Sequence, residues 1–66
     1  MNKNTKFKAE FLDGTGLVLY PTFLDLTGEE SWWGLEESNF AGLDAGDSRK
    51  IWDESGVCQV KFTRID

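Results

Sequence analysis

The stretch KFKAEFLDGTGLVLYP, residues 6–21, carries the pattern that predicts the fold of this chain. Phe7, Ala9 and Phe11 alternate with charged residues, which is typical of a half-buried β-strand, and a turn at residues 13–16 precedes a second apolar run. If the turn closes symmetrically, Ala9 pairs with Tyr20 and Phe11 with Val18, so the segment forms a β-hairpin. Its core face then carries Phe7, Ala9, Phe11, Val18 and Tyr20, and its outer face carries Leu17 and Leu19.

A second hairpin is predicted near the end of the chain, where RKIW and VCQVKFTRI surround a turn at residues 53–56. The same pairing rule places Ile51 opposite Cys58, and the alternation directs every second side chain inward. The inward set is Ile51, Cys58, Val60 and Phe62. The two hairpins together predict an antiparallel sheet of three or four strands, because an isolated hairpin is only marginally stable in water.

One short helix is predicted between the hairpins, in LTGEESWWGLEES, residues 26–38. Thr27 and Glu30 match the spacing of a capping box, so the helix would run from about Gly28 to Ser38 and pack on one face of the sheet. Gly34 in its interior would cost about 1 kcal/mol relative to alanine. Residues 21–26 form either a turn of helix or an extended connection, and residues 39–48 form a loop or a short turn. The fold class is therefore α+β.

The sequence Glu-Glu-Ser occurs twice in this segment, seven positions apart. Seven residues are almost two helical turns, so on a helix the second pair of glutamates lies above the first. On such a helix Trp32 and Leu35 would face the sheet. The outer side would form an acidic stripe around an exposed tryptophan, made of Glu29, Glu30, Trp33, Glu36 and Glu37.

Length and composition indicate a single domain, residues 1–66, with residues 1–5 flexible. One cysteine excludes an internal disulfide and fits a reducing compartment. Neither a signal peptide nor an apolar run long enough for a membrane helix occurs in the sequence, so we expect a soluble, cytoplasmic protein. The monomer and the homodimer both stay open.

The chain has twelve acidic and seven basic residues, a net charge of −5 and a pI near 4.5. The interval of residues 9–48 contains no basic residue. This charge disfavours direct binding to nucleic acid or to an anionic membrane. The chain also has no histidine, which removes histidine-based catalysis and histidine metal ligation, and we expect neither an enzyme nor a cofactor. Oxygen-bearing side chains in residues 44–55 lack the spacing of an EF-hand loop.

These properties together resemble, in overall character and without a shared motif, the small phage-encoded anti-CRISPR and anti-restriction proteins that mimic DNA. The resemblance implies a non-enzymatic inhibitor that acts in the bacterial host cell and blocks DNA entry into a CRISPR effector or restriction complex. Its partner would be a basic, nucleic-acid-binding protein, whose lysines and arginines the carboxylates can engage. On charge and position, the candidate partner-binding residues are Glu29, Glu30, Trp33, Glu36, Glu37, Asp44 and Asp47.

Three other interpretations stay open. The acidic residues could form a solvated face that only keeps a small domain soluble. The chain could be an acidic immunity or antitoxin-like protein that caps a basic toxin. It could also be a homodimeric accessory domain that associates through the outer face of its sheet.

Overall fold

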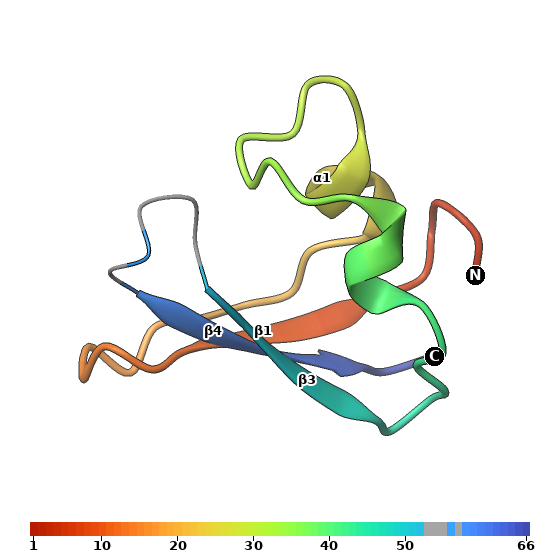
Figure 1. Ribbon diagram of the computed structural model, residues 1–66. Helices are drawn as coiled ribbons and strands as arrows, with labels where there is room; N and C mark the ends of the chain where they lie inside the picture. The colour runs from red at the N-terminus through yellow and green to blue at the C-terminus, as the bar shows by residue number, and fades with distance from the viewer. Residues whose placement is uncertain (53–55, 57) are drawn as a thin grey trace.

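A computed structural model describes residues 1–52, 56 and 58–66, and it confirms the α+β class (Figure 1). A four-stranded antiparallel sheet is covered on one side by a short helix and a turn of 3-10 helix. The strands are β1 (Phe7–Phe11), β2 (Val18–Leu19), β3 (Ser48–Trp52) and β4 (Gln59–Arg64), the α-helix is α1 (Phe23–Thr27), and the 3-10 helix is η1 (Glu37–Phe40).

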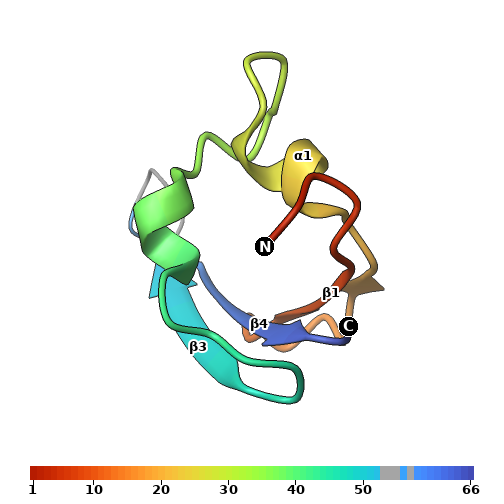
Figure 2. The same cartoon turned by 90° about the vertical axis from the view of Figure 1, so that its right-hand side faces the viewer.

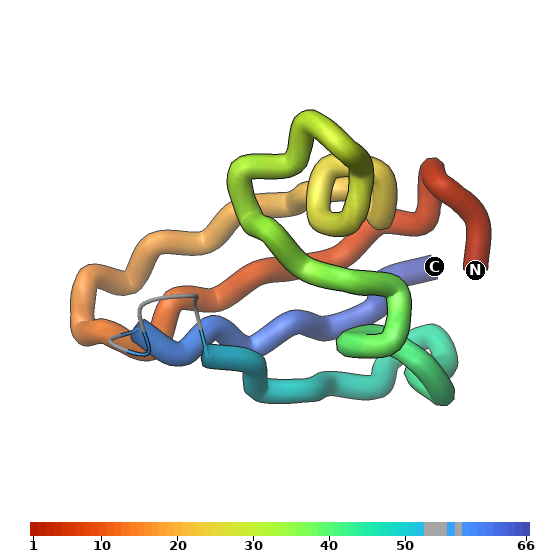
Figure 3. The backbone as a smooth tube through the Cα atoms, turned by 45° about the horizontal axis from the view of Figure 1, so that its top comes forward, coloured from red at the N-terminus to blue at the C-terminus, as the bar shows by residue number. Residues whose placement is uncertain are grey.

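The order of the strands in the sheet is β2-β1-β4-β3, so the first and last strands of the chain are its two central strands. Their pairing runs from Phe7 opposite Arg64 to Phe11 opposite Val60. Figure 3 shows the four strands side by side, with the segment from α1 to η1 crossing above them. Figure 2, turned by 90°, shows that the sheet curves and that α1 and η1 lie over its hollow side.

The core lies between the hollow face of the sheet and these covering segments, and it depends on aromatic rings. Four phenylalanines are buried there together with smaller apolar side chains. Large rings supply much of the buried area in a domain of this size, and aromatic pairs add about 0.5–1.5 kcal/mol each beyond that area. The buried apolar set is Phe7, Ala9, Phe23, Leu26, Phe40, Leu43, Val60 and Phe62.

The first hairpin forms as predicted, but its register differs by one residue. Ala9 pairs with Leu19, where the sequence predicted Tyr20. The loop is longer than a symmetric four-residue turn, because Phe11 N–H donates to Leu17 O across residues 12–16. A shift of one residue exchanges the two faces of a strand. The predicted core positions of Val18 and Tyr20 are therefore wrong: both side chains are exposed, and Leu19 packs against the core instead.

In the second hairpin the predicted pairing is shifted by two residues, which preserves the faces. Ile51 pairs with Val60 and not with Cys58. The inward directions are confirmed, since Val60 and Phe62 are buried while Ile51 and Cys58 pack against the core. Residues 53–55 of the predicted turn and residue 57, the first of the predicted last strand, lie outside the described residues.

One short helix packs on one face of the sheet, but it is not at residues 28–38; it lies at Phe23–Thr27, which confirms the turn-of-helix alternative for residues 21–26. It begins five residues earlier, because Thr22 forms the capping box with Asp25: Asp25 N–H donates to Thr22 Oγ1, and Thr22 N–H donates to an Asp25 carboxylate oxygen. The side chains of Phe23 and Leu26 then enter the core. The helix ends at Gly28, where a Cβ atom would lie 2.7 Å from the carbonyl oxygen of Leu24.

Residues 28–36, where most of the helix was predicted, form a loop. Gly34 has a φ of +66°, a left-handed conformation that interrupts a right-handed helix. The loop is held by tertiary contacts, since Leu35 N–H donates to Leu26 O and the side chains of Trp33 and Leu35 both pack against the core. These contacts need alternate residues to point inward, which a helix cannot provide.

Candidate functional site

All the carboxylates of the covering layer are exposed. We call this layer, residues 21–47, the acidic cap, because it contains no lysine or arginine. The segment from α1 to η1 crosses the hollow side of the sheet and is anchored by the core (Figure 3), and residues 44–47 form the turn that leads into β3. The exposed acidic residues of the cap are Asp25, Glu29, Glu30, Glu36, Glu37, Asp44 and Asp47.

Three of the five lysines lie on the face of the sheet opposite the cap. Strand alternation and register place Lys8, Lys50 and Lys61 on the outer face of the sheet, with Lys50 directly opposite Lys61. Glu10 is the neighbour of Lys61 on its other side and lies 3.9 Å from the Lys8 ammonium. The outer face of the sheet therefore carries three lysines and Glu10, whereas residues 21–47 contribute only acidic charges.

Two arginines fasten the cap to the sheet. The Arg49 guanidinium donates hydrogen bonds of 2.9 Å to the carbonyl oxygens of Asn39 and Ala41, at the end of η1. Arg64 donates to Leu43 O at 2.7 Å. These guanidinium groups satisfy carbonyls at the end of a short helix and in the loop after it, so both arginines have a structural role.

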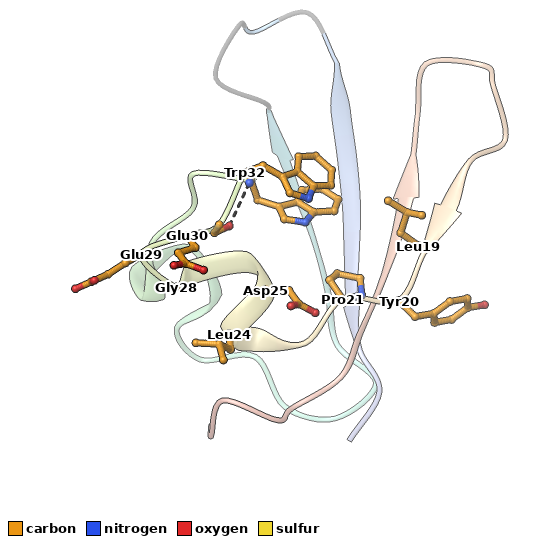
Figure 4. Close-up of a pocket in the computed structure, with 11 residues that line it drawn as sticks. Leu19, Tyr20, Pro21, Leu24, Asp25, Gly28, Glu29, Glu30 and Trp32 are labelled. Atoms are coloured by element: carbon orange, nitrogen blue, oxygen red, sulfur yellow. Dashed lines mark hydrogen bonds between the residues drawn. The ribbon is translucent and has the colours of Figure 1, made fainter.

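Glu29 and Glu30 lie in the loop that follows α1 and line an open groove of about 780 Å³ beside that helix (Figure 4). Trp32, Leu24 and Asp25 also line this groove. Neither glutamate side chain has a hydrogen-bond or ion-pair partner among the residues that the structure describes. The groove is thus an apolar and aromatic surface beside carboxylates, and no basic side chain is among its lining residues.

The other predicted acids lie further along the chain, around η1. Glu36 precedes η1, and Glu37 is its first residue. Asp44 and Asp47 share a turn, in which Asp44 N–H donates to an Asp47 carboxylate oxygen and Asp47 N–H donates to Asp44 O. Glu37 and Asp44 line one shallow depression, and Arg64 lines it with them. The predicted helical stripe is therefore wrong, because the two Glu-Glu pairs belong to different segments.

The two tryptophans have exchanged their predicted roles. Trp33, predicted to be exposed, is half-buried and packs on Phe11 and Phe62 at ring-centroid distances of 5.7 and 5.4 Å. Trp32, predicted to face the sheet, is 74% exposed and stacks on Trp33. The segment is a loop, so its inward residues follow the alternation that places Trp33 and Leu35 in contact with the core.

Asp25 was missed as a groove residue by the sequence interpretation. Hydrogen bonds from the backbone amide and the side chain of Thr22 hold the pKa of Asp25 below its ordinary value, with a smaller contribution from the charge of Lys6. The Thr22-Phe23-Leu24-Asp25 spacing, Thr-x-x-Asp before an apolar run, was the signal that could have identified it.

Known proteins give no relative of this chain. No family model, curated protein or solved structure matches it. Within residues 1–52, 56 and 58–66, no three histidine, cysteine, aspartate or glutamate side chains are grouped so as to hold a metal ion. No helix in this part of the chain has the length and apolar character needed to cross a membrane.

Proposed function

We propose that this chain is a non-enzymatic inhibitor that binds a basic, nucleic-acid-binding protein of a bacterial defence system through its acidic cap. The observation that carries the proposal is the composition of the cap, which has seven exposed carboxylates and no basic residue in residues 21–47. Proteins that bind duplex DNA present lysines and arginines to its phosphates, so a rigid array of carboxylates competes for the same groups.

The dimensions of the molecule fit this mode of binding. Its longest extent is 30 Å, which corresponds to roughly nine phosphates along each strand of a duplex. The cap has fewer charges than such a segment. Binding therefore depends on where the carboxylates are held and on apolar contacts beside them, for which Trp32 is the exposed candidate.

Hydrogen bonds from Arg49 and Arg64 support a cap whose segments keep fixed positions relative to the sheet. They tie η1 and the Leu43 segment to the sheet, while the Phe23 and Leu26 side chains anchor α1 in the core. A charged surface whose positions are fixed before binding loses less entropy when a partner docks.

The experiment is capture of partners from a bacterial lysate on the immobilised protein, at low and high salt and with competing duplex DNA. We expect a nucleic-acid-binding protein or complex that is retained at low salt and displaced both by salt and by DNA. Capture of a single basic toxic enzyme that DNA does not displace would contradict mimicry and favour the antitoxin interpretation.

A further inference from the structure

The groove beside α1 has an exposed aromatic wall that is fixed before any ligand arrives. Trp32 and Trp33 stack with ring centroids 4.4 Å apart and planes 21° apart, and Trp33 is itself packed on Phe11 and Phe62. The preceding residue also holds this loop, because Ser31 Oγ accepts a hydrogen bond from Trp33 N–H and donates one to Leu26 O. One face of the Trp32 ring is covered by Trp33 and the other is available to a ligand.

The charged side chains around this groove favour a positively charged ligand. Asp25, Glu29 and Glu30 line the groove, and no lysine or arginine does. Figure 4 shows Glu29 extending outward, while Glu30 and Asp25 lie over α1. An Asp25 carboxylate oxygen accepts from Thr22 N–H, whereas the groove carboxylates of Glu29 and Glu30 have no hydrogen-bond partner among the described residues. A phosphate-bearing or carboxylate ligand would be repelled here, whereas a cation is attracted by both the carboxylates and the indole face.

We propose that this groove binds an arginine side chain presented by a basic segment of the partner protein. A guanidinium is planar and weakly hydrated, so it can stack on Trp32 while its charge is attracted by the groove carboxylates of Glu29 and Glu30. A lysine ammonium is a compact, strongly hydrated charge that cannot stack in this way. This inference rests on the proposed function in one respect, namely that the basic segment belongs to the nucleic-acid-binding surface of the partner.

The site can be tested with short synthetic peptides and the intact 66-residue protein. The probe is the acetylated, amidated peptide Gly-Arg-Arg-Arg-Gly, and the controls are the same peptide with lysine or with neutral citrulline in place of arginine. The readout is the NMR signal of each indole N–H. The three tryptophans give three signals, and Trp52, exposed on the outer face of the sheet, is the internal control.

We expect the arginine peptide to shift the Trp32 signal in a saturable way and to leave Trp52 unchanged. Trp32→Ala and Glu30→Gln should each weaken binding, the former by about tenfold, which corresponds to a cation–π contact. Trp52→Ala should bind like the parent. Equal binding of the lysine or citrulline peptide, or unchanged affinity in Trp32→Ala, would overturn the inference.

The same variants separate this inference from the proposed function. If the peptide binds in the groove but no DNA-displaceable partner is captured, the arginine site stands and the proposed function fails. If a captured partner requires Glu36 and Glu37 but tolerates Trp32→Ala, mimicry stands and the groove assignment fails. Trp32 is exposed, so its replacement leaves the core intact and a loss of binding cannot be attributed to unfolding.

Discussion

Trp32 and Trp33 are neighbours in the sequence and stack on one another, yet only Trp33 is anchored in the fold. Its ring contacts Phe11 of β1 and Phe62 of β4, and through Phe62 it joins the ring of Phe40. Trp32 contacts the solvent over most of its surface. Trp33 therefore contributes to the packing of the core, whereas Trp32 is exposed on the surface.

Replacement of each tryptophan should show this difference in stability. Trp33→Ala should lower the free energy of unfolding by about 3 kcal/mol, because it removes a ring packed against the core. Trp32→Ala should cost less than about 1 kcal/mol. Urea unfolding followed by far-UV circular dichroism measures both values, and equal losses would contradict the assigned roles.

Gly34→Ala distinguishes the observed loop from the helix that the sequence predicted. In a helix, alanine in place of glycine would stabilise the protein by about 1 kcal/mol. At a φ of +66° the same change forces a Cβ into a left-handed conformation and should cost about 1 kcal/mol or more. The sign of the change in the thermal midpoint of unfolding distinguishes the loop from the helix. A stabilised variant would contradict the loop.

The strands were predictable because the alternation of Phe7, Ala9 and Phe11 is a local pattern that leaves one interpretation. Register was not, because it depends on loop length, and the loop over residues 12–16 is one residue longer than a symmetric turn. The helix was misplaced because Thr22 with Asp25 and Thr27 with Glu30 show equivalent capping patterns. Burial of the Phe23 side chain in the core favours the first, and this is a tertiary effect that the local pattern does not contain.

For the candidate site, the exposure of the acids was predictable from their density in residues 9–48, a stretch without basic residues. Their grouping was not, because it followed from the wrong helix. Nothing local distinguishes Trp32 from Trp33. The choice is made by Phe11 and Phe62, which come from opposite ends of the chain and meet through the pairing of β1 with β4.

Arg49→Met should loosen the acidic cap around η1. The change leaves the carbonyl oxygens of Asn39 and Ala41 without their donors, and each lost hydrogen bond costs about 0.5–1.5 kcal/mol. Lys50→Met removes the same charge from the outer face of the sheet and should have little effect. Hydrogen exchange of the amides of η1 should accelerate in the first variant alone. Equal exchange in both would show that Arg49 does not hold the cap.

The capping box of α1 gives the protein an acid-sensitive contribution to stability. The pKa of Asp25 is lowered in the folded state, so its contribution is fully present above the unfolded value of about 3.9 and is lost as the pH falls through the folded value. NMR titration of the side-chain carboxyl should show the lowered pKa, and Thr22→Ala should raise it towards normal. Thr22→Ala should also cost about 1 kcal/mol near neutral pH. Alanine keeps the backbone N–H of residue 22, so an unchanged pKa in that variant would contradict the contribution of the Thr22 side chain.

The central claim is that the acidic cap occupies the nucleic-acid site of its partner. The matched pair of variants is Glu36→Gln with Glu37→Gln, inside the cap, and Glu10→Gln with Asp66→Asn, outside it, which change the net charge equally. Asparagine at position 66 keeps the oxygen that accepts from Lys6 N–H. Neither pair lies in the core, so both variants should keep the parent's circular dichroism.

The most direct measurement is the displacement of fluorescent duplex DNA from the captured partner as this protein is added, followed by fluorescence anisotropy. We expect competitive displacement by the parent and by the Glu10/Asp66 variant. The Glu36/Glu37 variant should displace DNA weakly, and the variant that replaces Glu29, Glu30, Glu36 and Glu37 with glutamine should not displace it. A partner that binds DNA and this protein at the same time, or equal displacement by all four proteins, would contradict the claim.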